Sequence, residues 1–427
     1  MITFDLKTLP DWETLATGKH ILNIVAIAEN LIDSDKSDPI EFEAPPDYLC
    51  FTAEEAGSTV AMAVKGTPHK GQAFETSTDG TNWSVFTPGT TTITLAKTGD
   101  KVYFRGDNTT VSESSSIYYK FVMSGKIAAS GNIMSLLDKT CQSTTISNNY
   151  CYQRMFYGCK SLTTAPELPA TTLAMACYNY MFYGCTSLTT GPSILPATTL
   201  EYSCYQRMFY GCKSLTTAPE LPATTLADYC YNSMFDSCTS LTAAPELPAT
   251  KLESSCYYDM FLGCTSLTTG PSILPATTLA DYCYTNMFYG CTSLTTAPAL
   301  PATTLADYCY NSMFDSCTSL TAAPALPATT LKRSCYSKMF QRCTSLTTAP
   351  ELPATTLADY CYSNMFQGCE GLKISATQTG EYTTAWRIPS TGEIAAAATN
   401  WNTNMLVNTG GTFKRNPSIN TTYYIAA

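Results

Sequence analysis

The residues of this chain with the greatest capacity for chemistry are its cysteines. The chain has 427 residues and 20 cysteines, and most of the cysteines form nine pairs in which the two members stand eight residues apart. Cysteines at a fixed spacing can bind a metal, form disulfides, act as nucleophiles or pack in a core. The paired cysteines are Cys151, Cys159, Cys177, Cys185, Cys204, Cys212, Cys230, Cys238, Cys256, Cys264, Cys283, Cys291, Cys309, Cys317, Cys335, Cys343, Cys361 and Cys369.

The spacing of the cysteines argues against metal binding and catalysis. No Cys-x-x-Cys pair of the zinc-site type occurs among them. The two histidines, His20 and His69, lie outside the cysteine region, so no Cys–His pair of a thiol enzyme is present there. Residues eight apart on a helix are about 12 Å apart, which is too far for a disulfide within a pair. Packing as a core ladder is the favoured role, and disulfides between neighbouring repeats are the main alternative.

The cysteine pairs belong to a repeat of 26 or 27 residues. Both 27-residue steps contain "GPSILPATTL" where the other repeats read like "APELPATTL", so the extra residue is an insertion in a loop. A period of this length is typical of leucine-rich-repeat solenoids, in which units that cannot bury their apolar face alone stack on one another.

The pattern within one repeat predicts its local structure. Leu173, Cys177, Met181 and Cys185 follow one another at intervals of four, which predicts a short helix or 3-10 segment. The preceding "SLTTAPELP" combines β-compatible threonines with two prolines and predicts a short strand. The predicted fold is therefore a leucine-rich-repeat solenoid of nine strand-plus-short-helix coils, preceded by all-β segments.

The repeat motif "CYxxMFxGCTSLTTAPELPATTLA" resembles the BspA-like leucine-rich repeats of bacterial surface proteins, of the type found in gut Bacteroidales and their crAss-like phages. The resemblance covers about residues 146–372. It implies a surface for recognition or adhesion, without enzymatic activity and without a cofactor, and it fixes no ligand.

The flanking segments divide the chain further. Alternating apolar residues near the N-terminus predict a partial immunoglobulin- or fibronectin-like β module that serves as an anchor, and Asp79-Gly80 predicts a hairpin turn in a second all-β domain. A tail with Trp386, Trp401 and a Tyr423-Tyr424 pair is predicted to cap the last repeat, with partner contact as the rival role. The predicted domains are the partial module at 1–43, a β-sandwich at 44–124, an N-terminal cap at 125–150, the solenoid at 151–372 and a C-terminal cap at 373–427.

Composition narrows the class of protein. Charged residues make up 14% of the chain, well below the usual quarter, and the net charge is −10, which disfavours a nucleic-acid partner. No run of 18 apolar residues is present, so no membrane span is expected, and the first residues do not resemble a secretory signal peptide. The acidic run at Asp33, Asp35 and Asp38 lacks the glycine and final glutamate of a calcium loop, so no metal site is predicted.

Positions that vary while the core repeats are the candidate ligand contacts. One such position lies between Met-Phe and Gly-Cys and is predicted to point away from the Cys-Met stripe. Tyrosine, aspartate and glutamine on a rigid ladder could bind sugars or a flat protein surface, although drift at exposed sites gives the same pattern. The candidates are Tyr157, Tyr183, Tyr210, Asp236, Tyr289, Asp315, Gln341 and Gln367.

Two further sets of positions vary. The pair before Met reads Gln153-Arg154, Asn179-Tyr180, Tyr258-Asp259 and Ser337-Lys338 in different repeats. A weaker second face follows the predicted strands, at Glu167, Ile194, Glu220, Glu246, Ile273, Ala299, Ala325 and Glu351.

These observations favour a non-enzymatic protein on the surface of a virion, a fibre or decoration protein of a phage that infects Bacteroidales. The expected partners are other virion proteins, bound through the N-terminal β module, and a host surface glycan or protein, bound through the solenoid. A homo-oligomer is possible, and no membrane insertion is expected. The alternative is a secreted adhesin on a bacterial cell surface whose leader has been removed.

Overall fold

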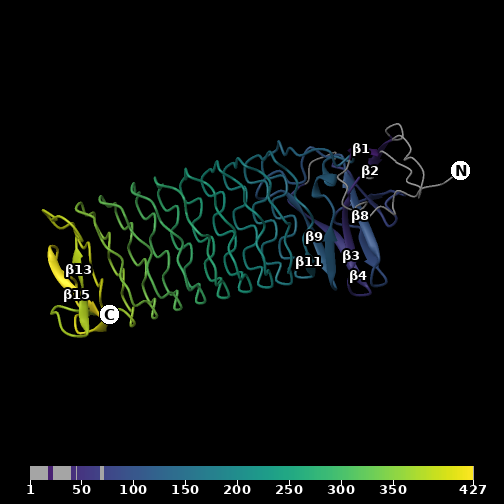
Figure 1. The fold of residues 1–427 in the computed structure, drawn as a ribbon. Helices are drawn as coiled ribbons and strands as arrows, with labels where there is room; N and C mark the ends of the chain where they lie inside the picture. The colour runs from purple at the N-terminus through teal and green to yellow at the C-terminus, as the bar shows by residue number, and fades with distance from the viewer. Residues whose placement is uncertain (1–17, 23–39, 45, 68–71, 427) are drawn as a thin grey trace, which may run out of the picture.

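Figure 1 shows an elongated molecule in which turns of the chain stack side by side between a β-sheet region near the N-terminus and a smaller one near the C-terminus. The structure is a computed structural model and describes residues 18–22, 40–44, 46–67 and 72–426. Within the described residues no helix is long and apolar enough to cross a membrane.

Most of the N-terminal module predicted at residues 1–43 lies outside the described residues, as do the acidic run and His69. What is described of the module is one pair of antiparallel strands, β1 (Gly18–Leu22) and β2 (Ile40–Ala44), with His20 opposite Phe42. They form a sheet of two strands that is separate from the other sheets.

Two sheets pack face to face in the region predicted as a β-sandwich. Phe51 of the larger sheet meets Phe121 of the smaller one edge to face at 4.8 Å, and Phe104 meets Phe121 at 5.2 Å. Their strands alternate buried and less buried residues, as in β4 and β8, which is the pattern of a sheet with one face in a core. The strands are β3 (Leu49–Ala53), β4 (Ser58–Lys65), β5 (Phe74–Ser77), β6 (Ser84–Phe86), β7 (Thr92–Leu95), β8 (Lys101–Gly106) and β9 (Tyr118–Ser124).

The sandwich and the repeats share one sheet. The smaller sheet has the order β7-β4-β9, and the larger has the order β11-β10-β3-β8-β5-β6. Strand β10 (Ile127–Ser130) pairs antiparallel with β3 and parallel with β11 (Leu162–Thr164), which belongs to the first repeat. The predicted N-terminal cap at 125–150, which also contains the 3-10 helix η3 (Ile133–Leu136), is therefore continuous with the sandwich.

The repeats contain tight turns where the sequence predicts helices. In the repeat that begins at Cys177, the amides of Tyr178 and Tyr180 donate to carbonyls of the next repeat at 3.0 and 2.9 Å. The amides between them, those of Asn179 and Met181, donate to the carbonyl three residues back at 3.4 and 3.1 Å. Half of the amides thus close turns, and the other half join neighbouring repeats.

The backbone angles explain why the helix prediction is wrong. Ala176, Tyr180 and Gly184 have φ of 55°, 58° and 68°, and the equivalent residues of the other repeats also lie in the left-handed region. A left-handed residue at every fourth position is incompatible with an α-helix. The spacing of four that predicts a helix is instead the period of these turns.

The predicted strands form only in part. β11 is the one strand assigned within residues 151–372 of the described chain. Later repeats make single parallel bridges at the same place, such as Thr164 with Thr190 and Thr269 with Thr296. The two prolines of each "APELP" segment lack the amide that a continuous ladder needs.

Aromatic side chains form two continuous ladders inside the stack. The phenylalanine of each Met-Phe pair lies 5.2–5.7 Å from its neighbour, with rings within 8° of parallel from Phe156 to Phe366. The tyrosine after the first cysteine forms a second ladder from Tyr152 to Tyr362, at 5.6–5.9 Å. All of these rings are buried.

The paired cysteines are buried and free, and no disulfide joins neighbouring repeats. The second cysteine of each pair has a regular partner. Its thiol donates to the phenylalanine carbonyl of the preceding repeat, and in the first repeat Cys159 donates to the Phe121 carbonyl of β9 at 3.1 Å. Cys264 donates to the Phe235 carbonyl at 3.1 Å and Cys343 to that of Phe314 at 3.0 Å. A small thiol therefore fills core space and adds a second hydrogen bond to a carbonyl that already accepts a backbone amide.

At the N-terminal end of the stack, the sandwich donates hydrogen bonds to the first repeat. The first repeat presents carbonyls toward the sandwich, since its amides point to the second repeat. The Phe121 amide donates to the Met155 carbonyl at 2.8 Å, and the Lys120 ammonium donates to the Tyr157 carbonyl at 3.4 Å. Phe121 also stacks on Phe156 at 5.3 Å, so it is the first ring of the phenylalanine ladder.

The C-terminal segment continues the turn pattern before it ends the stack. Alternate carbonyls from Thr399 to Val407 accept hydrogen bonds from amides of the ninth cysteine repeat. Asn400, Asn404 and Asn408 have positive φ at the same interval of four. Trp386 meets Phe366 edge to face and donates its indole N–H to the Pro350 carbonyl at 3.0 Å. The sheet here has the order β13-β15-β12-β14, from β12 (Lys373–Ser375), β13 (Tyr382–Ile388), β14 (Gly410–Gly411) and β15 (Thr421–Ala426).

The tyrosine ladder predicts two opposite effects of removing a hydroxyl. The Tyr152 hydroxyl donates to the Ile133 carbonyl at 3.0 Å, so Tyr152→Phe should lower the free energy of unfolding by about 1 kcal/mol. The buried Tyr257 hydroxyl has no hydrogen-bond partner within the described residues, so Tyr257→Phe should leave stability unchanged or raise it. Urea titrations of both variants test this, and a clear loss of stability in Tyr257→Phe would contradict it.

The burial of the cysteines predicts that they are unreactive in the native protein. Burial raises the pKa of the Cys256 thiol to about 12, and the other repeat thiols shift in the same direction. Native protein at about pH 8 should therefore incorporate almost no iodoacetamide, whereas urea-unfolded protein should be labelled at all cysteines. Mass spectrometry counts the labels, and an unfolded sample that stays unlabelled until it is reduced would reveal disulfides.

Candidate ligand-binding groove

The predicted ladder of variable residues forms a row on one side of the stack, but the row is less exposed than predicted. Tyr157, Tyr183 and Tyr210 are half-buried and stack face to face at 4.9 and 4.6 Å. Asp236 and Asp315 are only 6% and 2% exposed. The rows of turns place equivalent residues directly above one another, so each side chain covers its neighbour.

The row divides into two parts. Tyr157, Tyr183, Tyr210 and Asp236 lie together along a groove of about 350 Å³. The remaining candidates lie farther along the stack and make local contacts there. The Gln341 side chain donates to Gln367 and Arg342 lies 3.6 Å from Asp315, while Tyr289 is half-buried.

A second row of residues that line the groove comes from the position directly before each Met. This position supplies Arg154, Tyr180, Arg207, Ser233 and Asp259 in five consecutive repeats. All five have positive φ and line the groove. Polar residues tolerate this conformation better than β-branched ones.

The residue one place earlier has a different role. Gln153 donates its side-chain amide to Asn179 at 3.2 Å, and Asn179 donates to Gln206 at 2.9 Å. This ladder of amides is largely buried and joins successive repeats. The variable pair before Met thus contains one structural residue and one groove residue.

Two arginines of the groove contact tyrosine rings. Arg207 donates to the Tyr180 hydroxyl at 2.6 Å and its guanidinium lies 5.5 Å from the centre of the same ring. Arg154 lies 5.2 Å from the Tyr180 ring and 5.3 Å from the Tyr118 ring of β9. Cation–π contacts hold both cations at the groove without neutralising them.

Two carboxyl groups complete the groove, and both have perturbed acidity. Burial raises the pKa of Asp259 to about 6, against a hydrogen bond from Asn286 that lowers it. Burial also raises the pKa of Asp236, against a hydrogen bond from Ser237 and the nearby Arg207 charge. Partly desolvated carboxyl groups in a concave site are typical of functional sites.

The sequence predicts the row of tyrosines and Asp236 in full, but only part of the row that precedes each Met. Arg154, Tyr180 and Asp259 stand in pairs that sequence analysis marks as variable, whereas Arg207 and Ser233 were not singled out. Their position in the repeat is the signal that would have found them, since it is the same as that of Arg154. The sequence could not show that only these repeats combine two arginines with two carboxylates at one place.

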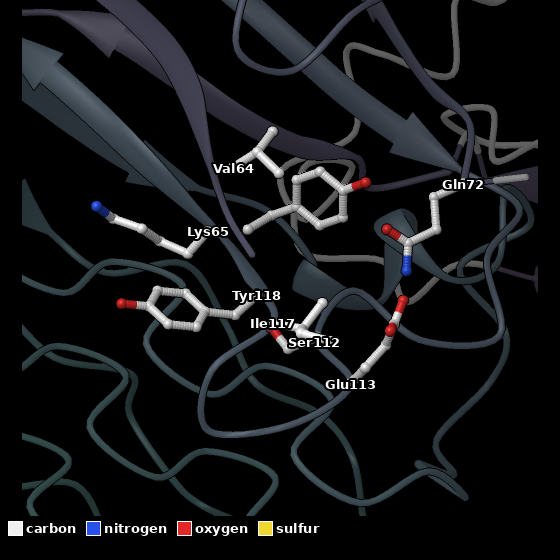
Figure 2. A pocket seen from close by; sticks show the side chains of 8 residues that line it. Val64, Lys65, Gln72, Ser112, Glu113, Ile117 and Tyr118 are labelled. Carbon is white, nitrogen blue, oxygen red and sulfur yellow. The ribbon is translucent and has the colours of Figure 1, made fainter. Parts of the chain in front are cut away.

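Two other hollows on the described surface are weaker candidates for a binding site. The hollow in Figure 2, where β4 ends at Lys65 and β9 begins at Tyr118, has no interior volume for a water molecule. A broader hollow of about 450 Å³ lies between the sandwich and the first repeats, with Lys126 and Lys160 beside Glu54 and several hydroxyl side chains. The residues of the predicted strand face are mostly exposed but line neither hollow.

The groove offers hydrogen bonds and charge but no reactive group. Its side chains are tyrosine, arginine, serine and aspartate, and no histidine or thiol is among them. No group of three or more histidine, cysteine or acidic residues that could hold a metal occurs in the described part of the chain. The arrangement is suited to binding.

Comparison with known proteins gives the family. The model of the BspA type leucine-rich repeat region matches residues 149–286 and 233–373, which together cover just over half of the chain. The chain belongs to this family of BspA-type leucine-rich repeat proteins. The prediction from the repeat motif is confirmed at this level, and repeats of this kind are typically non-enzymatic interaction domains.

Other comparisons add little. No curated protein matches the sequence. A crystal structure of a leucine-rich repeat protein from Bacteroides ovatus ATCC 8483 is similar at 19% identity, covering 54% of this chain and 81% of that chain, with a TM-score of 0.17. A TM-score this low carries no argument about structure or function.

The raised pKa of Asp259 predicts that Asp259→Asn increases the stability of the fold in a pH-dependent way. Because the folded state holds this proton more tightly than the unfolded state, the ionised carboxylate lowers stability as pH rises through about 6. The variant should match the wild type near pH 4 and be more stable at about pH 7.5, by about 1 kcal/mol after allowance for partial exposure. Urea midpoints at the two pH values test this, and a difference that does not change with pH would refute it.

Proposed function

We propose that this protein is a non-enzymatic recognition protein of a surface, which displays its repeats as a solenoid of nine coils and binds a host surface glycan or protein in the groove. The observation that supports this most directly is the concentration of arginine, tyrosine and desolvated carboxyl groups at one place on a stack that is otherwise repetitive. Membership of the BspA-type family, whose repeats are typically interaction domains, agrees with it.

The surface we propose is that of a phage virion, with the N-terminal β module as the anchor to other virion proteins. The described part of this module is a sheet of only two strands, β1 and β2. A partner strand that pairs with β1 or β2 would extend this sheet and so attach the module to another protein. The alternative setting is the surface of a bacterial cell, where the same module would join the repeats to the cell.

Binding to host cells should depend on the groove. The full chain with Arg207→Gln should bind Bacteroidales cells at least about tenfold more weakly than the wild type, because a charge-assisted hydrogen bond to a ligand is lost. Lys338→Gln is the matched control, since Lys338 occupies the equivalent place in a repeat outside the groove. Flow cytometry with labelled protein measures both.

Equal binding by both variants and the wild type would refute the groove as the recognition site. Mass spectrometry of purified virions and of bacterial surface fractions separates the two settings, and absence from virions would refute the phage assignment.

A further inference from the structure

We propose that the groove binds a neutral saccharide, through adjacent hydroxyl groups of the sugar, in preference to an acidic glycan or a peptide. This inference rests on the proposed function and specifies the ligand of the same site.

The charges of the groove balance without being paired to one another. Arg207 donates to the Tyr180 hydroxyl, while Asp236 accepts from Ser237 at 2.7 Å and Asp259 accepts from Asn286 at 3.0 Å. Each charged group therefore keeps hydrogen-bonding capacity for a ligand. An acidic sugar would meet two carboxylates and a basic peptide would meet two guanidinium groups, whereas a neutral polyol meets donors and acceptors alike.

The tyrosines of the row present edges and hydroxyl groups to a ligand. Both faces of Tyr183 are covered, by Tyr157 at 4.9 Å and by Tyr210 at 4.6 Å. A sugar therefore cannot lie flat on the middle ring of this row. It can follow the row lengthwise, with its hydroxyl groups hydrogen-bonded to phenol groups that recur at the spacing of the repeats.

The lining of the groove disfavours a peptide. Peptide and protein partners usually gain most of their affinity from a few tryptophan, tyrosine or arginine anchors in well-packed pockets from which water is excluded. No aliphatic side chain lines this groove, and its volume of about 350 Å³ is near the lower end of the range for small-ligand sites. A short run of sugar units fits both its size and its polarity.

The carboxyl groups give the binding a pH dependence. Asp259 faces Arg207, Asp236 and the Asn286 amide, and these are the groups that its pKa responds to besides burial. Sugar hydroxyl groups that donate to the carboxylates need them ionised, so affinity should rise as pH increases through about 6 and then level off. Proton release on binding at about pH 6 is the matching calorimetric signal.

A matched pair of variants tests the proposal. Asp236 and Asp315 lie in the same nine-residue sequence, "CYNSMFDSC", and both are nearly buried, but only Asp236 lines the groove. Titration calorimetry and a glycan array would use the full chain with neutral disaccharides of glucose, galactose and mannose and with the corresponding uronic-acid disaccharides. We expect binding to neutral sugars alone, at least tenfold weaker binding for Asp236→Asn, and unchanged binding for Asp315→Asn.

The outcomes separate this inference from the proposed function. Binding restricted to uronic-acid disaccharides, or equal losses in both variants, overturns the assignment of a neutral saccharide at this groove. No binding to any saccharide, together with Arg207-dependent binding to whole cells, also overturns it but leaves surface recognition standing. Loss of both kinds of binding from the wild type overturns the proposed function as well.

Discussion

The structure depends on one backbone arrangement, in which alternate amides of each turn segment donate to the next repeat. The amides of Tyr178 and Tyr180 point to the following repeat, while those between them close the turns. Every fourth residue must then adopt a left-handed conformation, at a cost of roughly 1–2 kcal/mol for a residue other than glycine. Inter-repeat hydrogen bonds and the burial of an unbroken core offset this cost, so no repeat could hold the conformation alone.

The side-chain ladders follow from this arrangement. Because the hydrogen bonds fix the register between repeats, each residue stands above its equivalent, and at the core positions like meets like. Rings stack on rings, amides bond to amides, and each second cysteine bonds to the preceding phenylalanine carbonyl. The same register determines which groups must be covered at the two ends of the stack. The sandwich supplies an amide and an ammonium to the exposed carbonyls of the first repeat, and an edge-on Trp386 meets the last phenylalanine.

The sequence predicts the repeats well because periodicity records which residues share an environment. The family, the burial of the Cys-Met stripe and the presence of β structure before the repeats all follow from patterns of residue type. The conformation of the repeat does not, since the spacing of four residues from Cys177 to Cys185 is shared by an α-helix and by successive four-residue turns. Only the glycine, asparagine and serine residues at left-handed positions distinguish the two, and Tyr180 or Arg207 at the same positions hides that signal. The turns at 400–409 are not predicted from the sequence either, because Trp401 and Thr409 stand where the repeats carry cysteines.

A site in such a protein is a property of several repeats and cannot be assigned to one. Asp236 and Asp315 share the same local sequence and nearly the same burial, yet their surroundings differ. Asp315 has Arg342 of the next repeat at 3.6 Å, whereas Asp236 lines a groove together with Tyr210, Arg207 and Asp259. The two copies of this sequence share the framework of a repeat, whereas their neighbours differ. The groove is therefore a combination across five adjacent repeats, and it includes Asp259, whose ionised carboxylate lowers the stability of the fold.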